Sequence, residues 1–357
     1  MVKNSHPAVI GRLAPSPTGR LHVGNARSLL LAWLSARSCG GKIVLRIEDL
    51  LPGQPEKVTS LLSDLSYLGL DWDDPGVDLG RRQVTDYAEQ GETGADFALQ
   101  SERHDAYHRV LMRLVDAGLV YPCICTRKDI EQAVRAPHDE TRGRAYPGTC
   151  RGRFVDIAAA RRYEAAQSSR AGRRPAGVAL RMRVDSDLVR FEDVLCGEQE
   201  VCLTQNSGDF VIRRKDGAFA YMLAVVVDDV AMGVNEVVRG DDILECTAQQ
   251  VVLYRAISEH CSADEVGAPV DRPPPRWLHV PLVHGDDGRR LAKRDRSIHV
   301  QALLQTGVSG ERFRRYLAGS LGLPETDDLY EMASAFSWDR VPRAAVVFGA
   351  TELAALR

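Results

Sequence analysis

The sequence predicts an α/β fold with a mostly parallel sheet, and its N-terminal part carries the main reasons. Residues 9–14 and 43–47 are short apolar runs typical of buried strands. Residues 26–37 lie between them and place apolar side chains on one helical face before Gly40 and Gly41 end the helix. Strand, helix and strand in this order form a βαβ unit, and its right-handed crossover makes the two strands parallel.

Four further segments extend this pattern along the chain. Residues 56–68 and 104–119 have the periodicity of amphipathic helices. Residues 218–228 and 277–283 are mostly apolar, which is compatible with buried strands and with short apolar helices. Periodicity alone does not separate these two alternatives.

Composition narrows the class of protein. A chain of 357 residues is long enough for about two domains, or for one large domain with insertions. With 44% hydrophobic and 27% charged residues, it has the composition of a globular protein rather than a disordered one. Its longest apolar run is shorter than the roughly 20 residues of a membrane helix, and the N-terminus lacks the apolar core of a secretion signal. We therefore expect a cytoplasmic protein without a membrane partner.

The net charge of −3 excludes a protein that coats nucleic acid with its whole surface, but it conceals two segments of opposite sign. Residues 71–96 contain eight acidic residues and two arginines, whereas residues 151–177 contain seven arginines and two acidic residues. Both segments are poor in large aliphatic side chains and are interrupted by Gly, Pro or Ser. This composition predicts two solvent-facing insertions.

The first strand-to-helix turn concentrates polar and conformationally special residues. Residues 12–25 read RLAPSPTGRLHVGN. His22 and Asn25 open the following helix, whose free N–H groups suit phosphate, and Gly24 lets a base or a phosphate approach the backbone. A lone His-x-Gly motif is more often an ordinary turn with a capping Asn25, so only the surrounding sequence separates the two interpretations.

The turn is the first of several motifs that together resemble the class I aminoacyl-tRNA synthetases, specifically their glutamyl branch. Its pattern A-P-S-P-T-G-x-L-H-x-G is similar to the nucleotide-binding signature of that family. The other motifs follow in the family's order: IED at residues 47–49, LGLDWD at 68–73, QSERHDAY at 100–107, AYMLAVVVDD at 220–229, VVRGDDIL at 237–244 and RLAKRD at 290–295. The resemblance implies a Rossmann-type catalytic domain that activates L-glutamate with ATP, giving glutamyl-adenylate and pyrophosphate.

The resemblance also implies the glutamate pocket. Glutamate carries two carboxylates and one ammonium, so its pocket needs cations and an anion at separate places. Arg12 and Arg239 are the expected carboxylate partners, Glu48 is the expected ammonium partner, and Ser16 and Tyr221 would supply hydroxyl groups. The full implied set is Arg12, Leu13, Ala14, Pro15, Ser16, Glu48, Tyr221 and Arg239.

Adenylate formation is an in-line attack on the α-phosphate, so it depends on alignment and on relief of phosphate charge. The family implies His22, Gly24, Asn25 and Lys293 as the catalytic residues. His22 and Gly24 would bind ATP on one side, and Lys293 would bind its phosphates on the other side and stabilise the charge of the transition state. Mg²⁺ is expected to accompany ATP.

The lysine loop departs from the family pattern K-[ML]-S-K. Arg290 stands for the first lysine and Ala292 for the serine, which removes one hydroxyl contact, whereas Lys293 is retained. Asn25 is a milder departure, because glutamyl-type enzymes commonly have a small polar residue where the class signature has a second histidine.

The cysteine spacing indicates a metal site. Cys123 and Cys125 form a C-x-C pair and Cys150 follows, so spacing alone leaves zinc and free thiols open. The pattern is similar to the zinc element of glutamyl-queuosine tRNA(Asp) synthetases and of some glutamyl-tRNA synthetases. That resemblance implies one structural Zn²⁺ held by the three cysteines and Tyr146, with His138 as a competitor of Tyr146.

The length after the lysine loop bears on the branch of the family. Only 64 residues (357 − 293) follow Lys293; residues 311–323 predict one amphipathic helix and residues 337–357 a short tail. A glutamyl-tRNA synthetase needs about one to two further domains there to bind the anticodon. The chain therefore resembles the truncated paralogues, the glutamyl-queuosine tRNA(Asp) synthetases. These activate glutamate without tRNA and esterify it to queuosine at the wobble position of tRNA(Asp). The alternatives are a shortened synthetase that charges a tRNA 3′ end and a non-catalytic paralogue.

This resemblance divides the chain into four parts. Residues 8–120 would form the first half of the catalytic domain, 121–200 an inserted zinc-binding subdomain, 201–300 the second half with the lysine loop, and 301–357 a short helical region without an anticodon-binding domain. The expected partners are ATP, L-glutamate and queuosine-containing tRNA(Asp), and we expect a monomer. The arginine-rich segment 151–177 is either an RNA-binding surface or a solvated loop.

Overall fold

The first half of the molecule contains the predicted βαβ unit. The computed structural model of the chain describes the following residues: 8–17, 20–51, 55–75, 96–134, 145–185, 188–289, 291 and 299–356. Strands β1 (Ile10–Leu13) and β2 (Lys42–Ile47) pair in parallel, and helix α1 (Val23–Ser38) connects them. Helix α2 (Pro55–Leu68) leads towards the short strand β3 (Ala98–Leu99), which is parallel to β2. The sequence prediction of β1, α1, β2 and α2 is confirmed, whereas β3 was not predicted.

A second set of strands continues the sheet beyond β1. These strands are β9 (Glu236–Gly240), β10 (Arg276–Val280), β6 (Leu188–Asp193) and β7 (Gly197–Cys202). β10 pairs in parallel with both β9 and β6, and β7 closes the edge in antiparallel orientation. The Ile10 N–H donates to Asn235 Oδ1 at 2.7 Å and the Asn235 N–H donates to the Ile10 carbonyl at 3.0 Å, so β9 begins beside β1.

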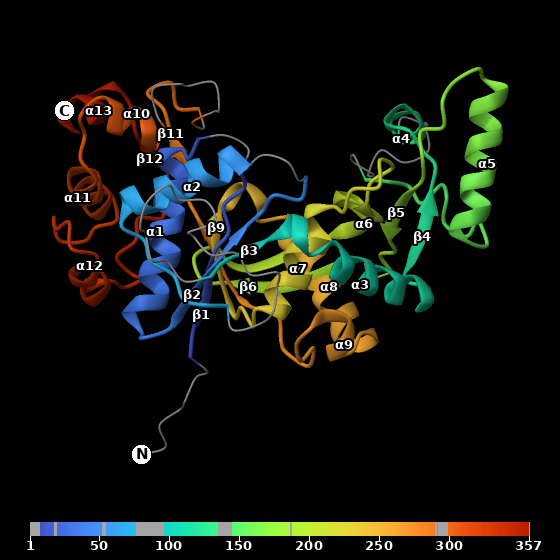
Figure 1. The fold of residues 1–357 in the computed structure, drawn as a ribbon, viewed down its shortest axis with the longest axis horizontal. Helices are drawn as coiled ribbons and strands as arrows, with labels where there is room; N and C mark the ends of the chain where they lie inside the picture. The colour runs from blue at the N-terminus through green and yellow to red at the C-terminus, as the bar shows by residue number, and fades with distance from the viewer. Residues whose placement is uncertain are drawn as a thin grey trace, which may run out of the picture.

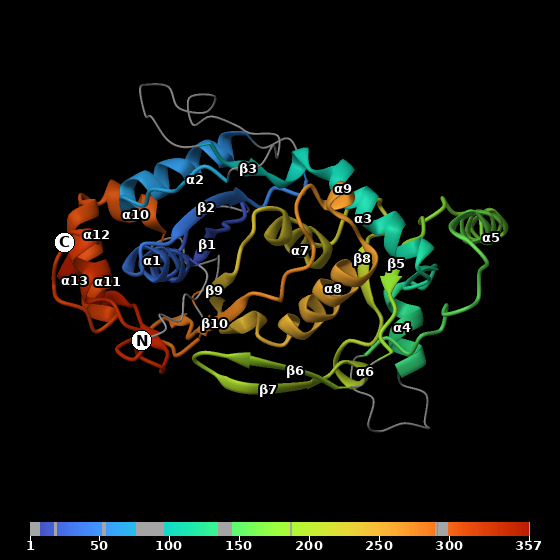
Figure 2. The same ribbon diagram turned by 90° about the horizontal axis from the view of Figure 1, so that it is seen from below.

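The resulting strand order places a crevice at a defined point. Across both sets the order is 3-2-1-9-10-6-7, with β1 and β9 as central neighbours. The chain leaves β1 through α1 towards β2 on one side, whereas β9 leads to β10 on the other side (Figure 2). In open parallel sheets, ligands bind beyond the carboxyl ends of the strands where the connections diverge in this way. The fold therefore predicts a binding site between the ends of β1 and β9.

The two apolar runs that periodicity left ambiguous have different structures. Most of the first becomes helix α7 (Tyr221–Ala231), which is buried on all sides after its first turn and therefore lacks a polar stripe. It packs against helices α3 (His104–Asp116) and α8 (Cys246–His260). The second run contributes strand β10 at the centre of the second set.

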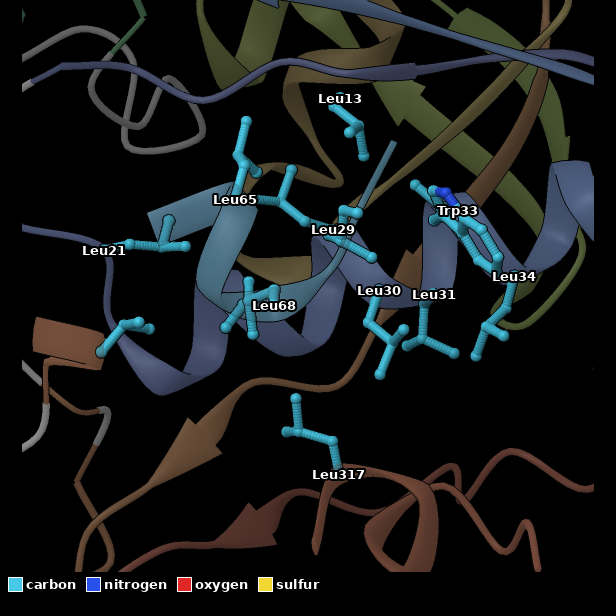
Figure 3. Packing of buried hydrophobic residues seen from close by; sticks show 14 of the residues in the cluster. Leu13, Leu21, Leu29, Leu30, Leu31, Trp33, Leu34, Leu65, Leu68 and Leu317 are labelled. Atoms are coloured by element: carbon cyan, nitrogen blue, oxygen red, sulfur yellow. The ribbon is translucent and has the colours of Figure 1, made fainter. Parts of the chain in front are cut away.

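Helix α1 lies in the middle of one hydrophobic core. Figure 3 shows Leu29, Leu30 and Trp33 of α1 between Leu65 of α2 and Leu317 of α11. The sequence predicted one apolar face, but α1 is buried nearly all round, because the sheet covers one side and the C-terminal helices cover the other.

An antiparallel sheet with flanking helices interrupts the parallel strands. β4 (Val120–Cys123), β5 (Ala179–Met182) and β8 (Phe210–Arg213) form this sheet in the order β4-β5-β8. The helices around it are α4 (Arg127–Val134), α5 (Ile157–Arg170) and α6 (Leu203–Asn206). Figure 1 shows α5 at one end of the long axis of the molecule and the C-terminal helices at the other.

The two charged segments were predicted as solvent-facing insertions, and the basic one is exposed over most of its length. The basic one is not an open loop, because its centre forms helix α5, capped by the Asp156 side chain. Most of the acidic one, residues 76–95, lies outside the described residues. At its start, Asp71 and Asp73 form ion pairs with Arg37 of α1 at 2.9 and 2.8 Å, so this part is held against the core.

The C-terminal region is more ordered than the predicted helix and tail. Its helices are α10 (Val300–Gln305), α11 (Gly310–Ser320), α12 (Leu329–Ala335) and α13 (Ala350–Leu356). The expected tail contains strand β12 (Val346–Val347), which pairs in parallel with β11 (Val283–His284). The tail therefore anchors the segment that follows β10. Among the described residues, no helix is long and apolar enough to cross a bilayer.

Candidate active site

A cavity of about 630 Å³ opens where β1 and β9 lie side by side. Ten of the predicted residues line it: Arg12, Ala14, Pro15, Ser16, His22, Gly24, Asn25, Glu48, Tyr221 and Arg239. Of the predicted glutamate set, only Leu13 is absent from this lining, because it is fully buried in the core. The strand order predicts this position, so the sequence motifs and the topology point to the same crevice.

Each charged residue of the cavity comes from the end of a different element. Arg12 lies on β1, Arg239 lies on β9, and Glu48 directly follows β2. Tyr221 is the first residue of α7. The Ser16 hydroxyl donates to Glu48 Oε2 at 3.4 Å, which ties the turn after β1 to the end of β2. The crevice thus brings together the Arg12 and Arg239 guanidinium groups and the Glu48 carboxylate from separate elements, and Asp242 adds a second carboxylate to its lining.

Arg12 and Glu48 are held by a chain of buried charges. Asp229 of α7 lies 3.2 Å from Arg12 Nε and accepts from Arg46 Nη1 at 2.6 Å. Arg46 Nη2 in turn donates to Glu48 Oε1 at 3.2 Å. The side chains of Arg46 and Asp229 are 0% and 1% exposed, so these contacts are strong because water does not screen them.

Asp228 is a second carboxylate that compensates the buried charge of Arg46. Asp228 accepts from Arg103 Nε at 2.5 Å and from the Tyr107 hydroxyl at 2.7 Å, and it lies 3.8 Å from Arg46. Burial alone would lower the pKa of Arg46, but Asp229, Asp228 and Glu48 hold it well above its usual value. Burial raises the pKa of Glu48, and the charge of Arg46 offsets part of this effect.

Arg239 is held by neutral and hydrogen-bonding partners instead. Its Nη1 donates to Gln250 Oε1 at 2.9 Å, its Nη2 donates to Thr247 Oγ1 at 2.7 Å, and its Nε donates to His279 Nε2 at 2.9 Å. Burial lowers the pKa of Arg239, and no carboxylate of the described residues hydrogen-bonds to it. Its positive charge therefore has no direct ionic partner of its own on the described side of the cavity.

The N-terminus of α1 faces the same cavity. His22 is the residue before the helix, and no side chain of the described residues caps this end, so the predicted alternative of a capping Asn25 does not occur. The His22 ring packs on the His299 ring with centroids 4.1 Å apart. A Cβ added at Gly24 would meet only Val283, at 3.6 Å, so internal packing does not require a glycine there. The backbone N–H groups at a helix N-terminus suit an anion.

The lysine loop lies outside the described residues. Lys293 has no described position. The same holds for Arg290 and Ala292, the two residues that depart from the family pattern. The neighbouring Leu291 lines the cavity beside Val283. His138 and the turn residues 18–19 also lie outside the described part of the chain.

The predicted cysteines meet at the end of β4. The ligand atoms of Cys123, Cys125 and Cys150 lie within 4.8 Å of one another, and these residues form the one such cluster among the described residues. The Tyr146 hydroxyl lies 3.4 Å from the Cys123 sulfur and 3.6 Å from that of Cys125. Hydrogen bonds from Cys125 and Cys150 lower the pKa of Cys123. Three sulfurs and one phenol at these distances fit a tetrahedral zinc site.

Sequence reasoning missed the residues behind the cavity. Arg46, Asp228, Asp229, His279 and Asp193 contact no expected ligand, yet they fix the residues that would. The signal for the two aspartates was available, because two adjacent acidic residues interrupt an otherwise apolar run. Burial of such a pair requires cationic partners.

The site can now be compared with known proteins. A family model described as the catalytic domain of the class I tRNA synthetases (E and Q) matches residues 8–328. The chain belongs to this family. A glutamyl-Q tRNA(Asp) synthetase from Nitratidesulfovibrio vulgaris is 43% identical to it over 88% of this chain and 86% of the relative. One from Nocardia farcinica is 42% identical over 93% of this chain and 91% of the relative.

Glutamate–tRNA ligases are matched over a smaller share of their length. Glutamate–tRNA ligase 2 from Alkalilimnicola ehrlichii is 37% identical, and the match covers 96% of this chain but 66% of the ligase. The crystal structure of a glutamate tRNA ligase from Elizabethkingia meningosepticum in complex with its amino acid has a TM-score of 0.71 at 24% identity. That match covers 97% of this chain and 68% of the ligase, and it shows a shared fold.

Proposed function

We propose that the chain activates L-glutamate with ATP, without tRNA, and then transfers the glutamate to queuosine at the wobble position of tRNA(Asp). The observation that carries this proposal is the cavity at the β1–β9 junction, which combines two buried guanidinium groups, a buried carboxylate and the free N-terminus of α1. The choice of acceptor is supported by the glutamyl-Q tRNA(Asp) synthetases, which match over most of their length.

The charges of the cavity match those of glutamate. Arg12 and Arg239 would bind the two carboxylates, and Glu48 would bind the ammonium. Backbone groups of residues 12–16 and the hydroxyls of Ser16 and Tyr221 would complete the pocket. Because Arg239 lacks an ionic partner among the described residues, a substrate carboxylate would supply one.

The nucleotide would lie beside the first turn of α1. His22, Gly24 and Asn25 would position its phosphates, and Lys293 would bind them from the lysine loop. Glu48 and Asp242 are the carboxylates among the described residues that line the cavity. This set fits Mg²⁺ that arrives with ATP rather than a cation held in a protein cage. Bound in this way, Mg²⁺ would neutralise phosphate charge.

The cysteine cluster supports a structural zinc site. Cys123, Cys125, Cys150 and Tyr146 would hold one Zn²⁺ and tie the end of β4 to the loop that precedes α5. Residues 121–200 would then form an inserted subdomain between the two catalytic halves, 8–120 and 201–300.

Helix α5 supports a contact with the RNA. Both acidic residues of the arginine-rich segment have internal partners: Asp156 caps the helix, and Glu164 accepts from Ser168 Oγ at 2.8 Å and from the Ala176 N–H at 2.9 Å. All seven arginines of this segment are exposed, and five of them lie on α5 or directly after it: Arg161, Arg162, Arg170, Arg173 and Arg174. This surface is therefore predominantly positive, which suits phosphates of a tRNA stem.

Two assays test the proposal. Wild-type protein should catalyse glutamate-dependent exchange between ATP and pyrophosphate in the absence of tRNA. Radiolabelled glutamate should then appear on queuosine-containing tRNA(Asp) and not on tRNA(Asp) that lacks queuosine. Exchange that requires tRNA, with label at the 3′ end, would favour a glutamyl-tRNA synthetase instead. A non-catalytic paralogue would give no exchange at any glutamate concentration.

A further inference from the structure

We propose that Asp193 and His279 form a relay that fixes the orientation of Arg239 and thereby the affinity of the cavity for a substrate carboxylate. Neither residue lines the cavity, so both are positioning residues. The inference rests on the proposed role of Arg239 in glutamate binding.

The relay is a continuous line of short, buried hydrogen bonds. His279 Nδ1 lies 2.6 Å from Asp193 Oδ2, and His279 Nε2 lies 2.9 Å from Arg239 Nε. The side chains of Asp193 and His279 are both 0% exposed. The three residues come from the adjacent strands β6, β10 and β9, so the sheet itself sets their spacing.

The chemistry of arginine determines which ring nitrogen carries the proton. A guanidinium group only donates hydrogen bonds, so His279 Nε2 must accept from Arg239 Nε. Neutral His279 therefore carries its proton on Nδ1, and Asp193 accepts that proton's hydrogen bond. Asp193 is the reason why this tautomer is favoured, because its carboxylate offers only acceptors.

Asp193 is itself held in place by the backbone. It accepts from the N–H groups of Leu195 at 3.0 Å, Cys196 at 2.9 Å and His279 at 3.1 Å. Burial alone would raise the pKa of Asp193, but its hydrogen bonds from His279 and Cys196 lower it. Asp193 therefore stays ionised, and the relay ends in a rigid anion.

The relay leaves a defined part of Arg239 for a ligand. A guanidinium group has five N–H donors. His279, Gln250 and Thr247 take one each from Nε, Nη1 and Nη2. One N–H on each terminal nitrogen remains, and Arg239 lines the cavity. Rotation of the guanidinium plane would break three hydrogen bonds at once, so the two remaining donors have a fixed direction.

Protonation of His279 would break the relay. The proton would enter at Nε2, which faces Arg239 Nε, so it would remove an acceptor and add a like charge. The charged groups around His279 are Asp193, Arg239 and Asp241, and Thr247 contacts it from α8. Burial lowers the pKa of His279, so the ring stays neutral at pH 7 and the relay is lost only as the pH falls below the usual histidine range.

The first test examines the tautomer without any activity measurement. In ¹⁵N NMR spectra of the wild-type chain at pH 7, the His279 ring should show a protonated Nδ1 and an unprotonated Nε2, assigned by comparison with His279→Gln. A protonated Nε2 would overturn the relay. In Asp193→Asn, the preference for the Nδ1–H form should weaken.

The second test measures glutamate-dependent pyrophosphate exchange. We expect His279→Leu to raise the KM for glutamate by about 10- to 100-fold, because it removes an acceptor from a buried charged donor, while the KM for ATP stays unchanged. His279→Gln should recover part of the affinity, since its amide oxygen accepts from Arg239. The control His108→Gln changes an exposed histidine of α3.

The two tests separate the relay from the proposed function. A KM for glutamate in His279→Leu equal to that of His108→Gln would contradict the relay even if the tautomer is correct. Absence of exchange in the wild type would contradict the proposed function, while the NMR result would still decide whether the relay exists.

Discussion

The cavity and the cysteine cluster both bury polar side chains, but they compensate the cost of burial in different ways. In the cavity, buried charges are compensated within the protein: Asp229 lies against both Arg12 and Arg46, and Arg46 reaches Glu48. In the cluster, Cys123, Cys125 and Cys150 have mainly one another and Tyr146 as hydrogen-bond partners among the described residues. A cation described beside them is Arg181, which lies over the Tyr146 ring at 3.8 Å.

This difference indicates whether each region requires a bound ligand in order to be stable. The cavity is ordered by the fold before a ligand arrives, which reduces the cost of binding. The cluster brings three thiol groups and a phenol together, and a metal ion stabilises such an arrangement of ligand atoms. Substitutions in the cavity should therefore act on glutamate activation, and substitutions in the inserted sheet should act on metal content and RNA transfer.

The largest effect is expected where one carboxylate compensates two arginines. Asp229→Asn leaves Arg12 and Arg46 with less negative charge in a buried place. We expect the free energy of unfolding to fall by about 3–5 kcal/mol, measured by urea denaturation, together with loss of pyrophosphate exchange. Asp116→Asn, at an exposed position of α3, is the matched control. Equal midpoints for the two variants would show that the cavity is not held by its own charges.

A smaller effect is expected at Glu48, the carboxylate that we propose binds the ammonium of glutamate. Glu48→Gln removes the proposed ammonium partner, but Arg46 retains Asp229 and Asp228, so the fold should tolerate the change. We expect the KM for glutamate to rise about 10- to 100-fold, with a nearly unchanged unfolding midpoint. The exposed Glu56→Gln serves as control. If Glu48→Gln bound glutamate as well as the wild type does, the orientation assigned to the amino acid would be wrong.

The sequence was most informative where local periodicity or spacing determines the structure. The βαβ unit follows from two apolar runs and an amphipathic helix, and the cysteine cluster follows from a C-x-C pair and a later cysteine. It was less informative for α7, because a helix buried on all sides has no stripe to distinguish it from a strand.

Local sequence patterns could not predict the residues that support the site. Asp193 and His279 are 86 positions apart and meet only because β6 and β10 are neighbours in the sheet. Arg46 and Asp229 are 183 positions apart. The motifs found groups that line the cavity, whereas the groups that hold them in place depend on strand order. The small strand β12 was missed for the same reason, because its partner β11 lies far away in the sequence.

The structural order of the cysteine cluster should depend on a bound zinc ion, whereas that of the cavity should not. Protein purified without chelator should contain about one zinc per chain, and Cys150→Ser should bring this towards zero. Elemental analysis measures the content, and hydrogen exchange should show faster opening around residues 121–125 in the variant. Cys261→Ser, outside the cluster, is the control. Pyrophosphate exchange should stay close to wild type in both variants, and metal-free wild-type protein would refute the zinc site.

The smallest effect is expected on helix α5, because exposed arginines contribute modestly and in a screened environment. Arg161→Ala with Arg162→Ala should raise the KM for tRNA by about 3- to 10-fold and reduce the salt dependence of transfer by about one ion per lost phosphate contact. Arg255→Ala with Arg340→Ala removes the same charge from exposed positions elsewhere. Pyrophosphate exchange should be unchanged in both. Equal transfer kinetics for the two double variants would mean that charge on α5 serves solubility alone. The inserted sheet would then differ from the cavity in its metal site and not in a contact of α5 with RNA.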